Sequence, residues 1–158
     1  MGRIRKPNGF NPEEYVWRNN DCYAYATNLK RPMDYIGYIS GYKNKAHFSK
    51  EELIERLVSD MEKENVYVYE TNFEQEPSDW EWKIAVFSVE TSRKEKYDYH
   101  FMREDSNGRW SHKFRGEKPT DKDLDGTKIV DPRLATIDKR YEYIFIGFFM
   151  YVRYASRS

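Results

Sequence analysis

Cysteine is nearly absent from this chain of 158 residues, in which Cys22 is the only one. A single cysteine excludes an intrachain disulfide and is typical of proteins from a reducing compartment. The chain also lacks an excess of charge of either sign, because Lys and Arg together number 27, as do Asp and Glu. Without the basic surplus of a general nucleic-acid binder, we expect no nucleic-acid partner.

Long apolar runs are missing as well. The stretch 143–152 comes closest to one, and its length suits a buried strand better than a bilayer crossing. The first residues are basic, but the apolar stretch of a secretory signal peptide does not follow them. We therefore expect a cytoplasmic protein with no membrane partner.

Aromatic residues, by contrast, are abundant. Tyr, Phe and Trp make up 17% of the chain, which indicates a core built more from rings than from aliphatic side chains. The length suits one domain with a sizeable core. We predict a single domain over 1–158, with an irregular N-terminal arm over 1–10.

Signals for helices lie in the N-terminal half. A short helix is expected from Asn11, and Asp21 is a capping residue for a second helix that begins at Cys22. Ser49 opens a capping box, and the apolar residues behind it recur at helical spacing. This pattern predicts an amphipathic helix over 50–64.

Signals for strands follow the helices. The expected strands cover 66–69, 82–89, 97–104, 109–114 and 143–154. Asp105 to Gly108 is a strong hairpin turn, and Gly147 predicts a bulge in the last strand. Helices first and an antiparallel sheet second is the α+β pattern, so we expect N-terminal helices packed on a C-terminal antiparallel sheet.

Cys22 is a candidate nucleophile. Behind the capping Asp21 it would lie beside unpaired backbone N–H groups and the positive end of the helix dipole, which favour a thiolate. A free cysteine is often only a small buried apolar residue, so a catalytic role requires a base within reach.

His100 and His112 lie on the two arms of the predicted hairpin. If its loop is 106–108, the numbers of paired residues sum to 214 and the two histidines share a face. A loop of two or four residues would put them on opposite faces. Asn107-Gly108 favours the three-residue form, because glycine takes the left-handed position. On a shared face, the first imidazole would take the thiol proton and the second would orient the first.

Asp131 is an alternative orienting group, since a carboxylate serves this role in similar triads. It also reads as an ordinary turn aspartate before Pro132. The segment Asp121–Gly126 copies the first half of a calcium loop, but the glutamate that the second half requires is missing. We expect no metal and no cofactor.

The order of these elements resembles the NlpC-type papain-like cysteine peptidases, in particular short bacterial and phage proteins of that kind. The resemblance implies a papain-like architecture, with Cys22 as nucleophile, His100 as general base and His112 as orienting group. Asn20, Tyr23 and Trp110 are assigned to substrate binding. The resemblance is carried by the segments 21–25, 82–89, 99–101 and 111–113.

The function implied is that of a small cysteine hydrolase, a peptidase, amidase or deamidase that attacks an amide bond of a peptide or protein through a thioester. Hydrolysis, deamidation and transglutamination share these steps, and the sequence does not separate them. If a phage encodes the protein, its compartment would be the host cytoplasm. The alternative is a catalytically inactive binding or inhibitory protein on the same scaffold that sequesters a protein partner, because a fold does not fix a function.

Overall fold

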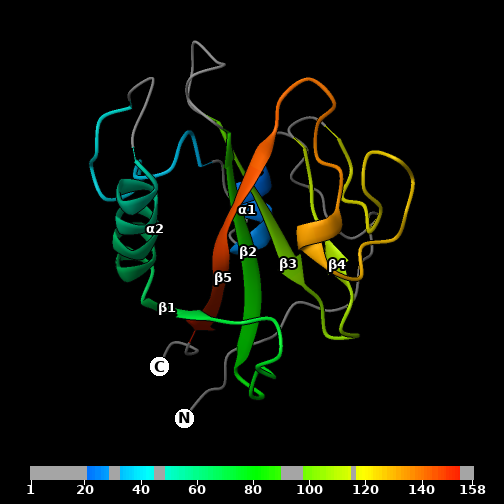
Figure 1. Cartoon of the computed structure of the whole chain (residues 1–158). Helices are drawn as coiled ribbons and strands as arrows, with labels where there is room; N and C mark the ends of the chain where they lie inside the picture. Colours follow the sequence, from blue (N-terminus) through cyan, green and yellow to red (C-terminus); the bar gives the residue numbers. More distant parts are fainter. Residues whose placement is uncertain (1–20, 29–32, 45–48, 90–97, 115–116, 154–158) are drawn as a thin grey trace.

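Within the part of the chain that the structure describes, two α-helices precede a five-stranded antiparallel sheet, which confirms the α+β class (Figure 1). A computed structural model describes residues 21–28, 33–44, 49–89, 98–114 and 117–153. The expected arm over 1–10, the helix from Asn11 and the candidate residue Asn20 lie outside these ranges. The elements are α1 (Cys22–Ala26), α2 (Lys50–Lys63), β1 (Val66–Thr71), β2 (Glu81–Val89), β3 (Tyr99–Glu104), β4 (Trp110–Ser111), the 3₁₀ turn η2 (Pro132–Leu134) and β5 (Tyr143–Arg153).

The sheet has the strand order β1-β5-β2-β3-β4, so the two longest strands lie next to each other near its centre. β2 is buried along nearly its whole length, which explains its continuous apolar sequence. The predicted bulge in β5 is present beside Gly147: Val86 pairs with Gly147 but Phe87 pairs with Phe145, which leaves Ile146 as the extra residue.

The helix α2 begins and ends close to the predicted limits. The Ser49 side chain accepts a hydrogen bond from the backbone N–H of Glu52 at 3.1 Å, as expected of an N-cap. Leu53, Leu57 and Met61 are buried at the helical spacing that predicted this element. Neither described helix has the length and hydropathy that a bilayer crossing requires.

Each face of the sheet carries its own apolar cluster. The first cluster joins α1 and α2 to one face and includes Trp82, Phe101 and Tyr151. The second lies on the other face, includes Phe87 and Trp110, and is completed by residues of the segment that follows β4. The sheet is therefore covered by helices on one side and by a long irregular segment on the other.

Candidate active site

The hairpin between β3 and β4 has the three-residue loop. Arg103 pairs with Ser111 and Glu104 with Trp110, so the paired numbers sum to 214 as predicted. The backbone N–H of Asp105 donates to the Arg109 carbonyl at 2.7 Å, and Gly108 has a φ of +80°. This left-handed conformation is the one that glycine adopts without strain. The register of the hairpin, and with it the shared face of the two histidines, is confirmed.

On that face the rings of His100 and His112 are hydrogen-bonded, with 2.7 Å between Nε2 of His100 and Nδ1 of His112. The other nitrogen of His112, Nε2, lies 2.9 Å from the carbonyl oxygen of Lys122. Because β4 ends at Ser111, His112 is held by a backbone bridge to Thr120 in place of a longer strand. A chain of three polar groups thus runs from His100 to the backbone of the segment after β4.

The carbonyl at the end of this chain fixes the tautomers. A carbonyl oxygen only accepts, so Nε2 of His112 carries the hydrogen, and in the neutral ring Nδ1 is then an acceptor. Nε2 of His100 must therefore donate, and the lone pair of the neutral His100 ring lies on its Nδ1. That nitrogen makes no hydrogen bond to any part of the chain that the structure describes. The arrangement leaves His100 with an unused basic nitrogen.

Two aromatic rings hold the His100 side chain in place. Phe114 stacks on it with ring centroids 4.9 Å apart, and Tyr143 lies edge-on at 6.2 Å. His100 is only 2% exposed and His112 is fully buried. Packing and hydrogen bonding together restrict the ring to one orientation, as a positioned base requires.

Cys22 begins α1, and Asp21 caps the helix by accepting hydrogen bonds from the backbone N–H groups of Tyr23 and Ala24 at 3.1 Å each. The Cys22 thiol is 7% exposed and donates to the backbone carbonyl of Tyr99, with 3.9 Å between sulfur and oxygen. No hydrogen bond joins this thiol to an imidazole within the described residues. The thiol therefore rests against the start of β3, one residue from His100.

The tyrosines of α1 that follow Cys22 pack the helix against β3 and the hairpin. Tyr23 packs against Phe101 on the face of β3 opposite to His100, because successive side chains of a strand point to opposite faces. Tyr25 contacts the hairpin, with its hydroxyl 2.6 Å from the Ser111 hydroxyl and its ring under the Arg103 guanidinium at 3.9 Å. Cys22 and the histidines thus approach from different faces and meet where β3 begins.

A pocket of about 320 Å³ lies at this meeting point and has both Cys22 and His100 in its wall. The start of β3 contributes Asp98 and Tyr99, and the start of β5 contributes Tyr143, whose hydroxyl donates to Asp98 at 2.5 Å. The remaining lining residues are Asp21, Asp34, Tyr35, Asn44, Lys113 and Phe114. A ligand in the pocket would contact the thiol and the base together.

Burial determines the resting charges of the site. It raises the pKa of the Cys22 thiol well above its usual value, and the neighbouring Asp21 carboxylate adds to this shift. Burial lowers the pKa of His100 well below its usual value, with His112 acting in the same direction. Burial also lowers the pKa of His112, against the hydrogen bond from its ring to the Lys122 carbonyl. The resting pair is therefore a neutral thiol and a neutral imidazole, which corrects the expected thiolate at the helix start.

The chain was compared with known proteins. It is 30% identical over 131 residues to insoluble matrix shell protein 1 of Ruditapes philippinarum, and the alignment covers 80% of this chain and 79% of that protein. The chain belongs to the family of insoluble matrix shell protein 1. No protein-family model matches the chain, and no solved structure matches it.

In this member of the insoluble matrix shell protein 1 family, Asp131 is not part of the histidine chain. Its carboxylate accepts from the Arg133 backbone N–H at 3.0 Å and pairs with the Arg133 guanidinium at 2.8 Å. It therefore caps η2, as a turn aspartate before proline does, and His112, not Asp131, is the group hydrogen-bonded to His100.

The assignment of Tyr23 and Trp110 to substrate binding is corrected by the structure. Tyr23 is fully buried and donates its hydroxyl to Asp60 at 2.7 Å. Trp110 is fully buried in the second apolar cluster. Both are core residues, and neither of them lines the pocket.

Sequence reasoning missed most of the pocket wall. The sequence pattern gives no role to Asp98, and it places Tyr143 only in a buried strand. Their common signal is position, because each lies at the start of a central strand at the same end of the sheet. No group of three metal-ligating side chains is present in the described parts of the chain.

Proposed function

We propose that the protein is a small cysteine hydrolase that acts on an amide bond. The observation that carries the proposal is the chain from His100 through His112 to the Lys122 carbonyl, which leaves one ring nitrogen of His100 unused, together with the pocket that both His100 and Cys22 line. Cys22 is the nucleophile, His100 the general base and His112 the residue that orients it. A papain-like, NlpC-type architecture is part of the same proposal.

The first half of the reaction forms a thioester. Sγ of Cys22 attacks the carbonyl carbon of the amide, and the thiol proton passes to Nδ1 of His100. The imidazolium then gives this proton to the departing nitrogen, and the C–N bond breaks. Because the resting pair is neutral, the proton moves during the attack and not before it.

The second half releases the acyl group. Water attacks the thioester carbon and gives a proton to His100, the C–S bond breaks, and the proton returns to the sulfur. If the departing group is ammonia the reaction is a deamidation, and if an amine replaces water it is a transglutamination. The residues of the pocket serve all three outcomes, so a peptide or protein amide is the expected substrate class.

A binding protein without activity is the second candidate. The name of the related protein describes an insoluble protein of a shell matrix, which favours a structural or binding role. The Cys22 thiol also rests on a backbone carbonyl and has a raised pKa, as a buried cysteine of the core would. In that case the pocket would hold part of a protein partner and no bond would be broken.

The two candidates are separated by reaction with iodoacetamide, which needs no known substrate. If His100 serves as the base for Cys22, replacing it with alanine slows alkylation near neutral pH by about tenfold or more, the scale of general-base assistance. In the wild type the alkylation rate keeps rising above about pH 8.5, the ordinary thiol value, because burial raises the pKa of the thiol. Equal rates in the wild type and His100→Ala would favour the binding protein.

The reaction class is tested on dimethylcasein as a general amide substrate. We expect ammonia release, new amino termini or incorporation of a fluorescent amine, together with an acyl adduct on Cys22 in the intact-protein mass. Cys22→Ala abolishes all of these signals. Asp131→Asn is the matched control, because its carboxylate is engaged with Arg133 away from the site.

A further inference from the structure

Asp60 is a fully buried carboxylate on α2 that accepts four hydrogen bonds. The hydroxyl of Tyr23 donates to one oxygen at 2.7 Å, and so does the backbone N–H of Gly37 at 2.7 Å. The other oxygen accepts from the backbone N–H of Ser40 at 3.0 Å and from its hydroxyl at 2.6 Å. The four donors come from two segments that both precede α2 in the sequence: α1 and the loop 33–44.

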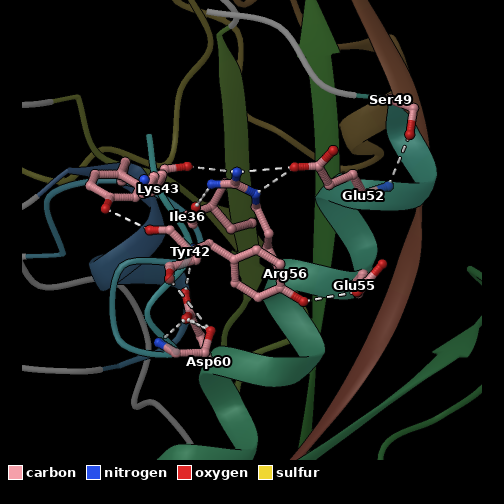
Figure 2. A network of polar contacts seen from close by, with 11 residues as sticks. Ile36, Tyr42, Lys43, Ser49, Glu52, Glu55, Arg56 and Asp60 are labelled. Atoms are coloured by element: carbon pink, nitrogen blue, oxygen red, sulfur yellow. Dashed lines mark hydrogen bonds and ion pairs between the residues drawn. The ribbon is translucent and has the colours of Figure 1, made fainter. Parts of the chain in front are cut away.

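Asp60 makes no ion pair with the described residues, although Arg56 lies one helical turn before it (Figure 2). The Arg56 guanidinium is used elsewhere: it donates to the carbonyls of Ile36 at 2.8 Å and Lys43 at 2.7 Å, and it pairs with Glu52 at 3.0 Å. Burying a carboxylate without a cation is costly and requires several donors. The donors here are supplied by the segments that Asp60 joins.

The loop held in this way forms one wall of the pocket. Tyr35 lines the pocket, and the backbone N–H of the next residue, Ile36, donates to the Tyr99 hydroxyl at 2.9 Å. Gly37 has a φ of +94°, and a Cβ there would lie 2.9 Å from Cβ of Tyr42 and 3.0 Å from Cδ of Arg56. Only glycine lets the loop approach α2 this closely.

We infer that Asp60 is a positioning residue for the candidate active site. Its bond to Tyr23 fixes the first turn of α1 and thereby the side chain of Cys22, the preceding residue. Its three bonds to Gly37 and Ser40 fix the pocket wall against that turn. The catalytic part of the inference rests on the proposed function. The positioning of Cys22 does not, and it is tested by the accessibility of the Cys22 thiol.

The experiment compares alkylation of Cys22 by iodoacetamide and by the bulkier N-phenylmaleimide. Tyr23→Phe removes one hydroxyl and one hydrogen bond to Asp60, and Ser40→Ala removes the hydroxyl bond, one of the three that the other segment makes to Asp60. We expect each change to raise the rate of maleimide labelling about tenfold relative to iodoacetamide, the scale of one hydrogen bond to a charged group. We expect this increase in the labelling ratio to stay constant as low concentrations of denaturant are added, because a local opening exposes little surface.

Tyr69→Phe is the matched control. The Tyr69 hydroxyl also donates to a carboxylate, that of Glu81 at 2.5 Å, but it lies on β1 away from the pocket. We expect its labelling ratio to equal that of the wild type. A ratio unchanged in both Tyr23→Phe and Ser40→Ala would overturn the inference, and so would an increase that follows global unfolding as denaturant is added. Failure of the proposed function has a different result, namely alkylation that does not depend on His100.

Discussion

Two buried polar networks flank Cys22, and they are built on different principles. On the side of α2, the Asp60 carboxylate is surrounded by four donors. On the side of the hairpin, His100 and His112 form a line of neutral groups that ends at a backbone carbonyl. The first network is saturated, whereas the second leaves one nitrogen of His100 unused.

This difference distinguishes a network that stabilises neighbouring segments from one that has an acceptor left for a substrate. A carboxylate with all of its strong acceptor positions occupied stabilises the segments around it but has no capacity left for a substrate. A histidine whose partner fixes its tautomer keeps a lone pair at a defined place. The comparison supports the proposals of a structural role for Asp60 and a chemical role for His100, and each proposal has a measurable consequence.

The largest effect is expected on catalysis through the histidine network. His100→Ala removes the general base, and we expect amide turnover to fall about 10²- to 10⁴-fold. The rate is measured as ammonia or amine release from dimethylcasein, with thermal unfolding as a check on folding. If Asp131→Asn lost as much activity as His100→Ala, the assignment of the orienting role to His112 would be wrong.

The next effect concerns stability through the carboxylate network. Asp60→Ala leaves four buried donors without their acceptor, and we expect the free energy of unfolding to fall by about 3 kcal/mol. Urea denaturation measures the change. His112→Ala, which leaves the single buried Nε2 of His100 to be satisfied, should cost less. An equal cost for the two variants would contradict the contrast between a saturated and an open network.

A smaller effect is expected at the turn that sets the histidine register. Gly108 has a left-handed conformation, and its Cβ position is open, so Gly108→Ala introduces backbone strain without a steric clash. We expect a loss of about 1 kcal/mol in the free energy of unfolding. Gly41→Ala has the same left-handed strain and open space in another loop, and it should lower the free energy of unfolding by a similar amount.

The smallest effect is a dependence of stability on pH. The pKa values of His100 and His112 are lowered in the folded state, so the unfolded chain binds more protons once the pH falls below about 6.5. The stability present at neutral pH is therefore lost as the pH falls toward the lowered values. The double variant His100→Gln/His112→Gln should show a flatter profile in urea denaturation between pH 7 and pH 5. An identical slope in both proteins would show that these rings are not buried neutral bases.

Local rules predicted the framework well because they act over a few residues. The capping box at Ser49, the spacing of Leu53, Leu57 and Met61, and the glycine at the end of the hairpin loop all gave elements that the structure contains. The same rules overestimated β4, which stops at Ser111 because its next residue bridges to Thr120. That bridge joins two segments, and no local sequence pattern in either of them predicts the pairing.

The site was less predictable, since its parts come from distant segments. The sequence indicated Cys22, His100 and His112, and the hairpin register follows from turn chemistry alone. It gave no indication that Tyr23 would be tied to Asp60, or that Asp98 and Tyr143 would line the pocket. A helix packed on a sheet can bury the residue that follows a candidate nucleophile, as Tyr23 is buried beside Cys22.

What the amino-acid sequence settles here is local: where helices start, which residues alternate along strands, and that Gly108 closes a three-residue loop. Turn geometry and side-chain period are properties of short segments, so they can be read without the fold. The neutral state of Cys22 and His100 was decided by the packing of the whole chain, because desolvation depends on everything that surrounds a group. The contact of His100 with His112 and not with Asp131 likewise depends on the tertiary structure, in which Arg133 pairs with Asp131 and the Lys122 carbonyl lies 2.9 Å from His112.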